Sequence, residues 1–244
     1  MSARLLDGRA VASAILAEAR RRSRALKRRR GRVPRLAIVS ASGAAAGSYL
    51  KAKLSACAAA GVEVAVHRLS PGPRAKTLGL LADLAGDASI DALIVETPYP
   101  RGLSAADVAS SIPAAKDAEG VTPEAYGRLF LAKSWGEAAM LVGPCTAVAL
   151  ARLARAAKVP LAGRRAVVIG RSATVGRPAA HLLSTFDLTV TLTHSRTRNL
   201  AALCREALRP RVRERDGEVQ RREEVRGRPP DGGGAADDDR PPSR

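Results

Sequence analysis

The sequence predicts an α/β protein with two domains and a polar C-terminal tail. Short apolar runs of strand length alternate with helical segments, a second alternating unit begins after residue 143, and residues 205–244 contain 11 Arg and 10 acidic residues. Strands that alternate with helices of about ten to thirteen residues form largely parallel sheets. We therefore expect an N-terminal three-layer βαβ domain at 1–143 and an incomplete α/β domain at 144–204.

The N-terminal domain is predicted to contain three strands, with helices between them. In the first helix, Val11, Ile15 and Ala19 recur at four-residue spacing and form one apolar face. Ligands of parallel sheets bind beyond the carboxyl ends of the strands. The helices are expected at 9–30, 48–60 and 76–85, the strands at 36–39, 62–66 and 90–95, and the ligand-binding loops at 40–47, 67–73 and 96–103.

The second domain repeats this alternation over a shorter stretch of chain. Its helices are expected at 146–158, 176–184 and from 198, and its strands at 166–170 and 188–193. Beyond residue 204 the chain has too few apolar side chains to offset the entropy lost on ordering. We predict that residues 205–244 form a disordered tail.

Composition excludes several functional classes. Of the 244 residues 46% are hydrophobic but only 2% are aromatic, and the formal net charge is +18. No apolar run approaches the roughly 18 residues of a membrane span, and Asp7 and Arg9 interrupt any signal peptide. The charge would suit nucleic acid, but an Arg-rich composition explains it as well and stacking aromatic residues are scarce. We expect a cytoplasmic protein with neither a membrane nor a nucleic-acid partner.

The three cysteines are far apart in the sequence. This spacing favours neither a disulfide framework nor a metal site, so no metal is expected. We expect Cys57 and Cys145 to serve as small core residues.

A glycine turn is the clearest chemical motif. The apolar strand ending at Gly170 runs through Arg171 and Ser172 to Gly176, where a helix begins. Glycines allow a ligand close to the backbone, and a helix N-terminus offers N–H groups and a positive dipole to a phosphate. The turn is typical of a Rossmann-type dinucleotide site. Because the spacing is not GxGxxG, an ordinary strand–helix turn is the alternative.

The end of the following strand favours NADP. His194 and Ser195 lie where dinucleotide folds bind the adenosine ribose, and an acidic residue there would select NAD. A hydroxyl flanked by basic groups, with Arg171 nearby, suits a 2′-phosphate instead. The alternative is a polar strand end without a ligand.

Candidate catalytic residues lie in the first domain. Tyr49 and Lys53 are four residues apart and project from one helix face, while Glu96, Pro98 and Pro100 follow the third strand. A surface Tyr–Lys pair is the usual explanation of such spacing. Here the helix starts after the first strand, so Lys53 would be partly desolvated, with a lowered pKa, and could serve as a base or proton relay.

Residues 116–120 form an acidic turn in the predicted ligand crevice. Asp117 and Glu119 offer carboxylates to the N–H donors of a heterocycle. A helix-capping turn is the alternative for the same residues.

Taken in order, these motifs resemble those of the methylenetetrahydrofolate dehydrogenase/cyclohydrolase (FolD) family over residues 4–204. The matching segments are Leu5-Leu6-Asp7-Gly8, Ser48-Tyr49 with Lys53, Cys57 and Gly61, Val95 with Pro98 and Pro100, Lys116-Asp117 with Gly120, Gly127-Arg128-Leu129, Pro144-Cys145-Thr146, Val168 to Pro178, and His194-Ser195 with Thr197.

The resemblance implies two activities and a set of roles. They are NADP-dependent oxidation of methylene-tetrahydrofolate and hydrolysis of the methenyl product to 10-formyl-tetrahydrofolate, within one-carbon metabolism and purine biosynthesis. Lys53 would be the cyclohydrolase catalyst and Tyr49 would stack on or orient the folate, in a cytoplasmic homodimer. Catalytic roles are expected for Lys53, Tyr49 and Glu96, substrate binding for Tyr49, Pro98, Pro100, Asp117 and Glu119, and NADP binding for Gly170, Arg171, Ser172, Gly176, His194 and Ser195.

The sequence departs from the family at three places. Glu96 replaces a glutamine and Glu119 an aspartate, and a carboxylate near Lys53 should raise its pKa and slow hydrolysis more than hydride transfer. The third departure is the tail at 205–244, which suggests a truncated or frame-shifted C-terminus with open sheet edges. A non-catalytic remnant that binds a ligand or a partner subunit is therefore the alternative function.

Overall fold

In the computed structural model, which describes residues 6–41, 47–70, 72–100 and 102–208, the N-terminal domain is built on a parallel three-stranded sheet. Its strands lie in the order β2 (Glu63–Leu69), β1 (Arg35–Ala41) and β3 (Ala92–Val95). In the register, Val39 of β1 is opposite both His67 and Val95. The three carboxyl ends therefore meet at one edge of the sheet.

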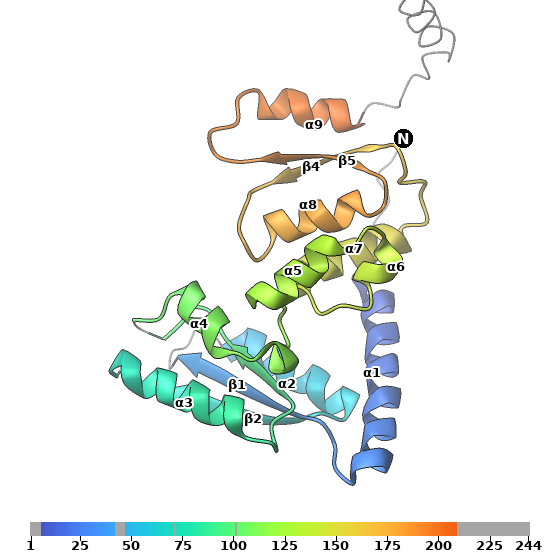
Figure 1. Cartoon of the computed structure of the whole chain (residues 1–244). Helices are drawn as coiled ribbons and strands as arrows, with labels where there is room; N and C mark the ends of the chain where they lie inside the picture. Colours follow the sequence, from blue (N-terminus) through green and yellow to red (C-terminus); the bar gives the residue numbers. More distant parts are fainter. Residues whose placement is uncertain (1–5, 42–46, 71, 101, 209–244) are drawn as a thin grey trace, which may run out of the picture. The chain divides into compact units, whose positions relative to one another are not determined.

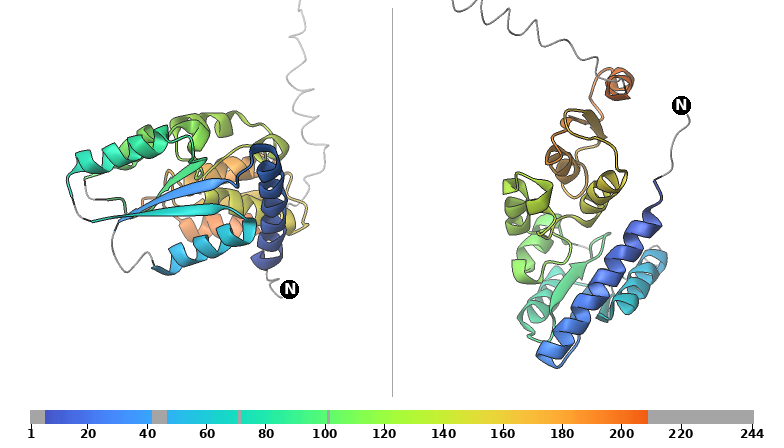
Figure 2. Two further views of the ribbon diagram at one scale, coloured as in Figure 1. Left: turned by 90° about the horizontal axis from the view of Figure 1, so that it is seen from below. Right: turned by 90° about the vertical axis from the view of Figure 1, so that its right-hand side faces the viewer.

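Helices cover both faces of this sheet, which confirms the predicted three layers. One face packs against α3 (Arg74–Gly86) and α4 (Ala105–Ser111), and the other against α2 (Gly47–Ala60). Figure 2 shows the sheet between α3 and α2. The alternation of side chains along β1 explains the layers, since Ala37 and Val39 face one core and Leu36 and Ile38 the other.

The second domain has a parallel pair of strands, β4 (Arg165–Ile169) and β5 (Thr189–Thr193), within the described residues. Helices α7 (Cys145–Ala156) and α8 (Gly176–Ser184) share a core with these strands. The helix α9 (Leu200–Leu208) lies on the other side of the pair from α8 (Figure 1). The predicted two-domain α/β class is confirmed.

Two findings differ from the predicted element boundaries. The last helix continues to Leu208 rather than stopping at 204, because Leu203 and Ala207 are one turn apart and both half-buried. Of the tail predicted to be disordered at 205–244, residues 205–208 are helical, so that part of the prediction is wrong, and residues 209–244 lie outside the described residues. Between the two sheets, four short elements were not predicted: α4, a 3-10 turn at Ala114–Lys116, α5 (Pro123–Leu131) and α6 (Trp135–Ala138).

The long helix α1 (Gly8–Arg30) lies beside both α2 and α7 (Figure 1). Asp7 caps its first turn by accepting the N–H of Arg9, and Gly31 ends it in the left-handed region with φ 75°. Ser23 fixes it to the sheet layer by donating to the carbonyl of Gly61. The helix therefore runs from one domain to the other.

Candidate active site

A pocket of about 260 Å³ lies at the carboxyl edge of the N-terminal sheet. The residues that line it come from α2, the loop after β3, the acidic turn, the start of α7 and the glycine turn. They are Tyr49, Lys53, Glu96, Thr97, Tyr99, Glu119, Val121, Pro144, Cys145, Thr146, Thr174 and Val175. Of the residues predicted as sites, the structure therefore brings Tyr49, Lys53, Glu96 and Glu119 together.

Lys53 is held between two carboxylates. Its ammonium nitrogen lies 3.0 Å from Oε1 of Glu96 and 3.5 Å from Oε1 of Glu119. The side chain of Lys53 is 19% exposed and that of Glu96 only 6%. The expectation that a carboxylate stands within reach of Lys53 is confirmed, and the pair is largely shielded from water.

This arrangement determines the protonation state of Lys53. Burial lowers the pKa of Lys53, but the ion pair with Glu96 and the charge of Glu119 outweigh it and raise the pKa above its usual value. The prediction that desolvation lowers the pKa of Lys53 is therefore wrong. The prediction that nearby carboxylates raise this pKa has the right direction. Lys53 is a charged ammonium at neutral pH.

Tyr49 provides an aromatic surface next to this cation. The ring centroid lies 4.9 Å from the Lys53 nitrogen, one turn away on α2, and the residue is 65% exposed. A cation over the ring face fixes the ring orientation while leaving the other face free. Tyr49 can therefore stack on a planar ligand in the pocket.

The two acidic residues of the turn at 116–120 have different environments. Asp117 is buried and accepts the backbone N–H groups of Glu119, Gly120 and Thr122. Glu119 points into the pocket, and burial, which outweighs the attraction of Lys53, raises the pKa of its carboxyl. The Asp117 carboxylate therefore holds the turn itself, with Thr122 and not Asp117 as the N-cap of α5, whereas Glu119 is available to a ligand. Substrate binding by Asp117 stays a prediction.

The segment after β3 presents different residues from those predicted. The Thr97–Pro98 peptide is cis, and Thr97 and Tyr99 line the pocket, whereas Pro98 and Pro100 are not among its described lining residues. Substrate binding by the two prolines stays a prediction. Because alternate residues of an extended segment point to opposite sides, the spacing of the prolines was itself the signal for Thr97 and Tyr99.

A close backbone contact positions the start of α7. Gly120 has φ +67°, and a Cβ placed on it would lie 2.4 Å from the Cα and carbonyl carbon of Gly143. Only glycine allows this approach. It brings Cys145 into the pocket, where burial raises the pKa of the thiol. The prediction of Cys145 as a core residue is therefore wrong, although Cys57 does pack against the core beside Leu50.

The glycine turn closes on itself before α8. A Cβ on Gly176 would lie 2.0 Å from the carbonyl oxygen of Gly170, which has φ +108°. The hydroxyl of Ser172 accepts the N–H groups of Val175 and Gly176, and its carbonyl accepts that of Arg177. The helix N-terminus is thus already capped, and the expectation of free N–H groups there is wrong.

Free backbone donors lie one step earlier in the turn. The four N–H groups of residues 171–174 have no acceptor within the described part of the chain. Successive N–H groups in such a turn form a concave anion site. These N–H groups fit the diphosphate of a dinucleotide, and the side chain of Arg171 at the start of the turn is exposed.

The second predicted nucleotide-binding loop stands beside the first. Ile169 and Thr193 are paired in the β4–β5 register, so Arg171 and His194 follow adjacent strand ends. The Nδ1 atom of His194 accepts the N–H of Arg196, which closes a turn that exposes Ser195. His194 therefore shapes the loop, and the Ser195 hydroxyl is exposed where a ribose substituent would lie.

The two domains meet at the pocket. Thr174 and Val175 of the glycine turn line it together with Lys53. The hydroxyl of Tyr126 on α5 donates to the carbonyl of Ala173 at 2.8 Å and ties the turn to the segment between the sheets. Sequence reasoning missed Tyr126 as well as the pocket roles of Thr174 and Val175, although the turn itself was predicted.

Two searches of the described residues were negative. No helix among them is long and apolar enough to cross a membrane. No group of three His, Cys, Asp or Glu side chains in the same residues could hold a metal ion.

Comparison with known proteins assigns both domains. Residues 6–119 match the family model described as the catalytic domain of tetrahydrofolate dehydrogenase/cyclohydrolase, and residues 144–208 match its NAD(P)-binding domain. The bifunctional protein FolD of Parafrankia sp. is 42% identical over 209 residues, which cover 84% of this chain and 72% of that relative. FolD of Treponema pallidum is 40% identical over 211 residues, 85% of this chain and 65% of the relative.

Solved structures of the same kind superpose on the chain. The bifunctional FolD of Campylobacter jejuni gives a TM-score of 0.76 at 30% identity, covering 83% of this chain and 71% of that one. The Trypanosoma brucei FolD, solved with NADP cofactor and inhibitor, gives 0.74 at 30% identity, covering 84% and 70%.

The fold and the pocket define an α/β enzyme that binds a dinucleotide next to a second ligand. The chain belongs to the tetrahydrofolate dehydrogenase/cyclohydrolase family. The predicted family and the predicted dinucleotide cofactor are confirmed.

Proposed function

We propose that this chain oxidises methylene-tetrahydrofolate with NADP. A hydride leaves the methylene carbon between N5 and N10, and the methenyl cation remains. NADP, when bound, supplies the hydride acceptor. The observation that carries the proposal is the shared pocket, which is lined both by Tyr49 and Lys53 and by Thr174 and Val175 of the glycine turn. Hydride transfer depends chiefly on holding two rings together in such a space.

The folate side of the pocket would orient the pterin. The exposed ring of Tyr49 offers a stacking face, and the carboxyl of Glu119 offers an acceptor for the N–H donors of the heterocycle. Lys53 keeps Glu96 and Glu119 close together despite their like charge. The three side chains thus form a fixed polar edge beside an aromatic surface.

The nucleotide side would select the phosphorylated cofactor. The N–H groups at 171–174 suit the diphosphate, and Arg171 with the Ser195 loop suits the 2′-phosphate. The absence of a carboxylate at positions 194–196 supports NADP rather than NAD, because an acidic side chain would repel that phosphate.

Hydrolysis of the methenyl product should be the slower activity. Water must add to the methenyl carbon and lose a proton before the bond to N5 breaks. A base accepts that proton only when it is itself unprotonated, and the pKa of Lys53 is raised by its carboxylate partners. We infer that most of the methenyl product leaves before Lys53 can assist its hydrolysis.

The test is an absorbance assay of the purified chain with methylene-tetrahydrofolate and NADP. We expect NADPH to form, and the methenyl compound to accumulate with it. Tyr49→Ala should lower kcat/KM by about tenfold through loss of one stacked pair. Lys51→Ala, on the same helix and outside the described pocket lining, is the matched control and should leave the rate unchanged. No NADPH at saturating substrate would overturn the proposal.

Binding without turnover is the second candidate. The described nucleotide domain has only two strands, and Ile169 on β4 is 66% exposed. An incompletely covered sheet would hold the dinucleotide loosely. Titration of NADPH by fluorescence separates the candidates, because binding with no oxidation of substrate supports the second and absence of binding excludes both.

Three further properties belong to this proposal. They are assembly as a homodimer, a cytoplasmic location and the supply of one-carbon units to purine biosynthesis, each suggested by the resemblance to the family. Sedimentation equilibrium of the purified chain tests the first, since a dimer should have about twice the mass of the 25.5 kDa chain.

A further inference from the structure

The hydroxyl of Tyr126 connects α5 to the glycine turn that precedes α8. It donates to the carbonyl of Ala173 at 2.8 Å. Within the described part of the chain, residues 171–175 form no other hydrogen bond with a residue outside the turn and α8. Residues 171–175 are all exposed, so packing contributes little to their position. The bond from Tyr126 therefore does much to determine where the turn lies.

The helix α5 is itself fixed at both ends. Its N-cap Thr122 accepts the N–H of Ala125 and donates its own N–H to the buried carboxylate of Asp117. Toward the other end, Leu129 lies in the core that α5 shares with α8, and its carbonyl oxygen is 2.7 Å from Nε2 of His181. The helix therefore holds the phenol in a defined position.

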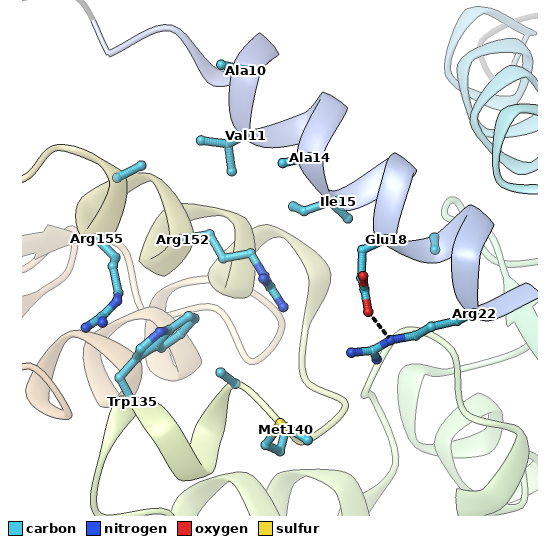
Figure 3. Close-up of a pocket in the computed structure, with 13 residues that line it drawn as sticks. Ala10, Val11, Ala14, Ile15, Glu18, Arg22, Trp135, Met140, Arg152 and Arg155 are labelled. Atoms are coloured by element: carbon cyan, nitrogen blue, oxygen red, sulfur yellow. Dashed lines mark hydrogen bonds and ion pairs between the residues drawn. The ribbon is translucent and has the colours of Figure 1, made fainter.

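The helix α6, which follows α5, is packed against the second domain as well. The ring of Trp135 stacks on Phe186, with 5.1 Å between the ring centroids. Arg152 of α7 lies near the same ring (Figure 3), with its guanidinium carbon 6.0 Å from the centroid. These contacts give α5 a firm support on the side away from the glycine turn's loop.

The contact with Tyr126 orients a whole peptide unit. The carbonyl of Ala173 and the N–H of Thr174 belong to one planar unit, which is trans, since the cis peptide among the described residues is Thr97–Pro98. In a trans unit the carbonyl and the N–H point in opposite directions. With the carbonyl held toward α5, the N–H of Thr174 must point away from α5. That N–H has no acceptor in the described part of the chain, and Thr174 also lines the substrate pocket.

Tyr126 can do this without touching a ligand. The residue is half-buried and is not among the described lining residues of the substrate pocket. Burial, together with the charge of Asp117, raises the pKa of the Tyr126 phenol, so it is protonated and donates at neutral pH. Any effect on the reaction must therefore pass through the peptide that the hydroxyl holds.

We propose that Tyr126 is a positioning residue of the dinucleotide site, whose hydroxyl holds the Ala173–Thr174 peptide so that the Thr174 N–H stays open to the dinucleotide. This inference rests on the proposed NADP-dependent oxidation. Without the hydroxyl, the exposed turn must be ordered when the dinucleotide binds, and the binding free energy has to offset that cost. The loss should therefore appear in dinucleotide affinity rather than in the rate of hydride transfer.

Tyr126→Phe tests the proposal, because it removes the donor and keeps the ring. We expect the Kd of NADPH and the KM of NADP each to rise about fivefold, as for the loss of one hydrogen bond, while kcat at saturating NADP changes by less than about twofold. Fluorescence titration and steady-state absorbance measure these values, and circular dichroism checks that the variant is folded. An unchanged Kd and KM, or a fall in kcat alone, would overturn the proposal.

Ser184→Ala is the matched control. Its hydroxyl on α8 donates to the carbonyl of His181 at 2.6 Å, so this variant loses a bond of the same kind outside the described pocket lining. The Kd of NADPH should stay at the value of the unchanged chain. A loss of affinity equal to that of Tyr126→Phe would show that any lost hydroxyl in the domain has this effect, and would count against a specific role of Tyr126.

Hydrogen–deuterium exchange of the ligand-free chain separates this inference from the proposed function. The N–H groups of Val175 and Gly176 are bonded to Ser172 within the turn. A turn released by Tyr126→Phe should exchange them faster, whereas exchange in α3 stays the same. If the unchanged chain formed no NADPH, the proposed function would fail, but faster exchange in the turn would still support the role of Tyr126. Unchanged exchange in the turn would overturn it.

Discussion

The ammonium nitrogen of Lys53 lies 3.0 Å from Oε1 of Glu96, and both side chains are largely buried. A glutamine at position 96 would place a neutral amide oxygen at this contact instead of a negative charge. The carboxylate therefore holds the proton on Lys53 more firmly than a neutral acceptor would. This one contact connects a residue substitution visible in the sequence to the balance between oxidation and hydrolysis.

Glu96→Gln is expected to increase hydrolysis relative to oxidation. Removing the nearest negative charge lowers the pKa of Lys53, and each unit of change gives about tenfold more unprotonated amine at neutral pH. We expect hydrolysis of methenyl-tetrahydrofolate to rise by about tenfold, while NADPH formation changes by less than about threefold, since hydride transfer needs no base. Both rates are measured by absorbance on the same preparation.

Glu124→Gln is the matched control for this substitution. Glu124 forms an exposed ion pair with Arg128 on α5 at 2.5 Å and is not among the described residues of the pocket. Its loss should change neither rate. If Glu96→Gln left the ratio of hydrolysis to oxidation at the value of the unchanged chain, the carboxylate would not be what restrains Lys53.

A second carboxylate, that of Asp107, should contribute to the pH dependence of the protein's stability. Backbone and side-chain hydrogen bonds from Ser104, together with one from Arg74, lower the pKa of Asp107 from 3.8 to about 2. A carboxyl with a lowered pKa in the folded state stabilises the protein above its unfolded pKa, and this stabilisation is lost as the pH falls through 3.8 toward 2.

Asp107→Asn tests this dependence. The variant should unfold at a lower temperature than the unchanged chain at pH 6, and the difference should shrink as the pH falls toward 2. Asp83→Asn on α3 is the control, because Asp83 is exposed and forms no ion pair among the described residues. A difference in melting temperature that stayed constant down to pH 2 would show that the charge of Asp107 contributes nothing.

The sequence predicted the functional residues of individual loops better than it predicted which loops lie next to one another. Lys53 and Glu96 follow from topology alone, since a helix after β1 and a residue after β3 share one edge of a parallel sheet. Thr174 and Val175 could not be placed near them, because their position depends on how two domains pack. The capping of α8 by the Ser172 hydroxyl could not be predicted either, because it depends on the rotamer of that side chain.

The short helices between the sheets were missed for a different reason. Elements of four to nine residues give too few apolar positions to define a period. Their caps were visible, because Ser104 with Asp107 forms a capping box and Thr122 precedes Pro123. Reading caps before periodicity would have located α4 and α5.

Arg171→Ala is expected to reduce the preference for the phosphorylated cofactor. A guanidinium bound to a 2′-phosphate contributes only when that phosphate is present. The affinity for NADPH should fall by about tenfold, and the affinity for NADH by less than threefold. Arg164→Ala, at the amino end of β4, is the control and should alter neither. Equal losses for both nucleotides in fluorescence titrations would place Arg171 on the shared diphosphate instead.

Gly176→Ala adds a single methyl group and should destabilise the nucleotide-binding domain. The new Cβ would lie 2.0 Å from the carbonyl oxygen of Gly170 and 3.0 Å from the Cα of Arg171, and backbone atoms cannot rotate away as a side chain can. Overpacking of this kind costs about 1–3 kcal/mol. We expect that loss in denaturant unfolding, together with weaker NADPH binding, because the turn with the free N–H groups must move.

Gly79→Ala is expected to have the opposite effect on the stability of the protein. Gly79 lies inside α3, and its added Cβ would meet no atom within 4 Å. Alanine at this helical position should stabilise the protein by about 0.5–1 kcal/mol and leave NADPH binding unchanged. If Gly176→Ala were as well tolerated as Gly79→Ala, the close packing of the turn on α8 would be wrong, and with it the placement of the turn beside the folate pocket.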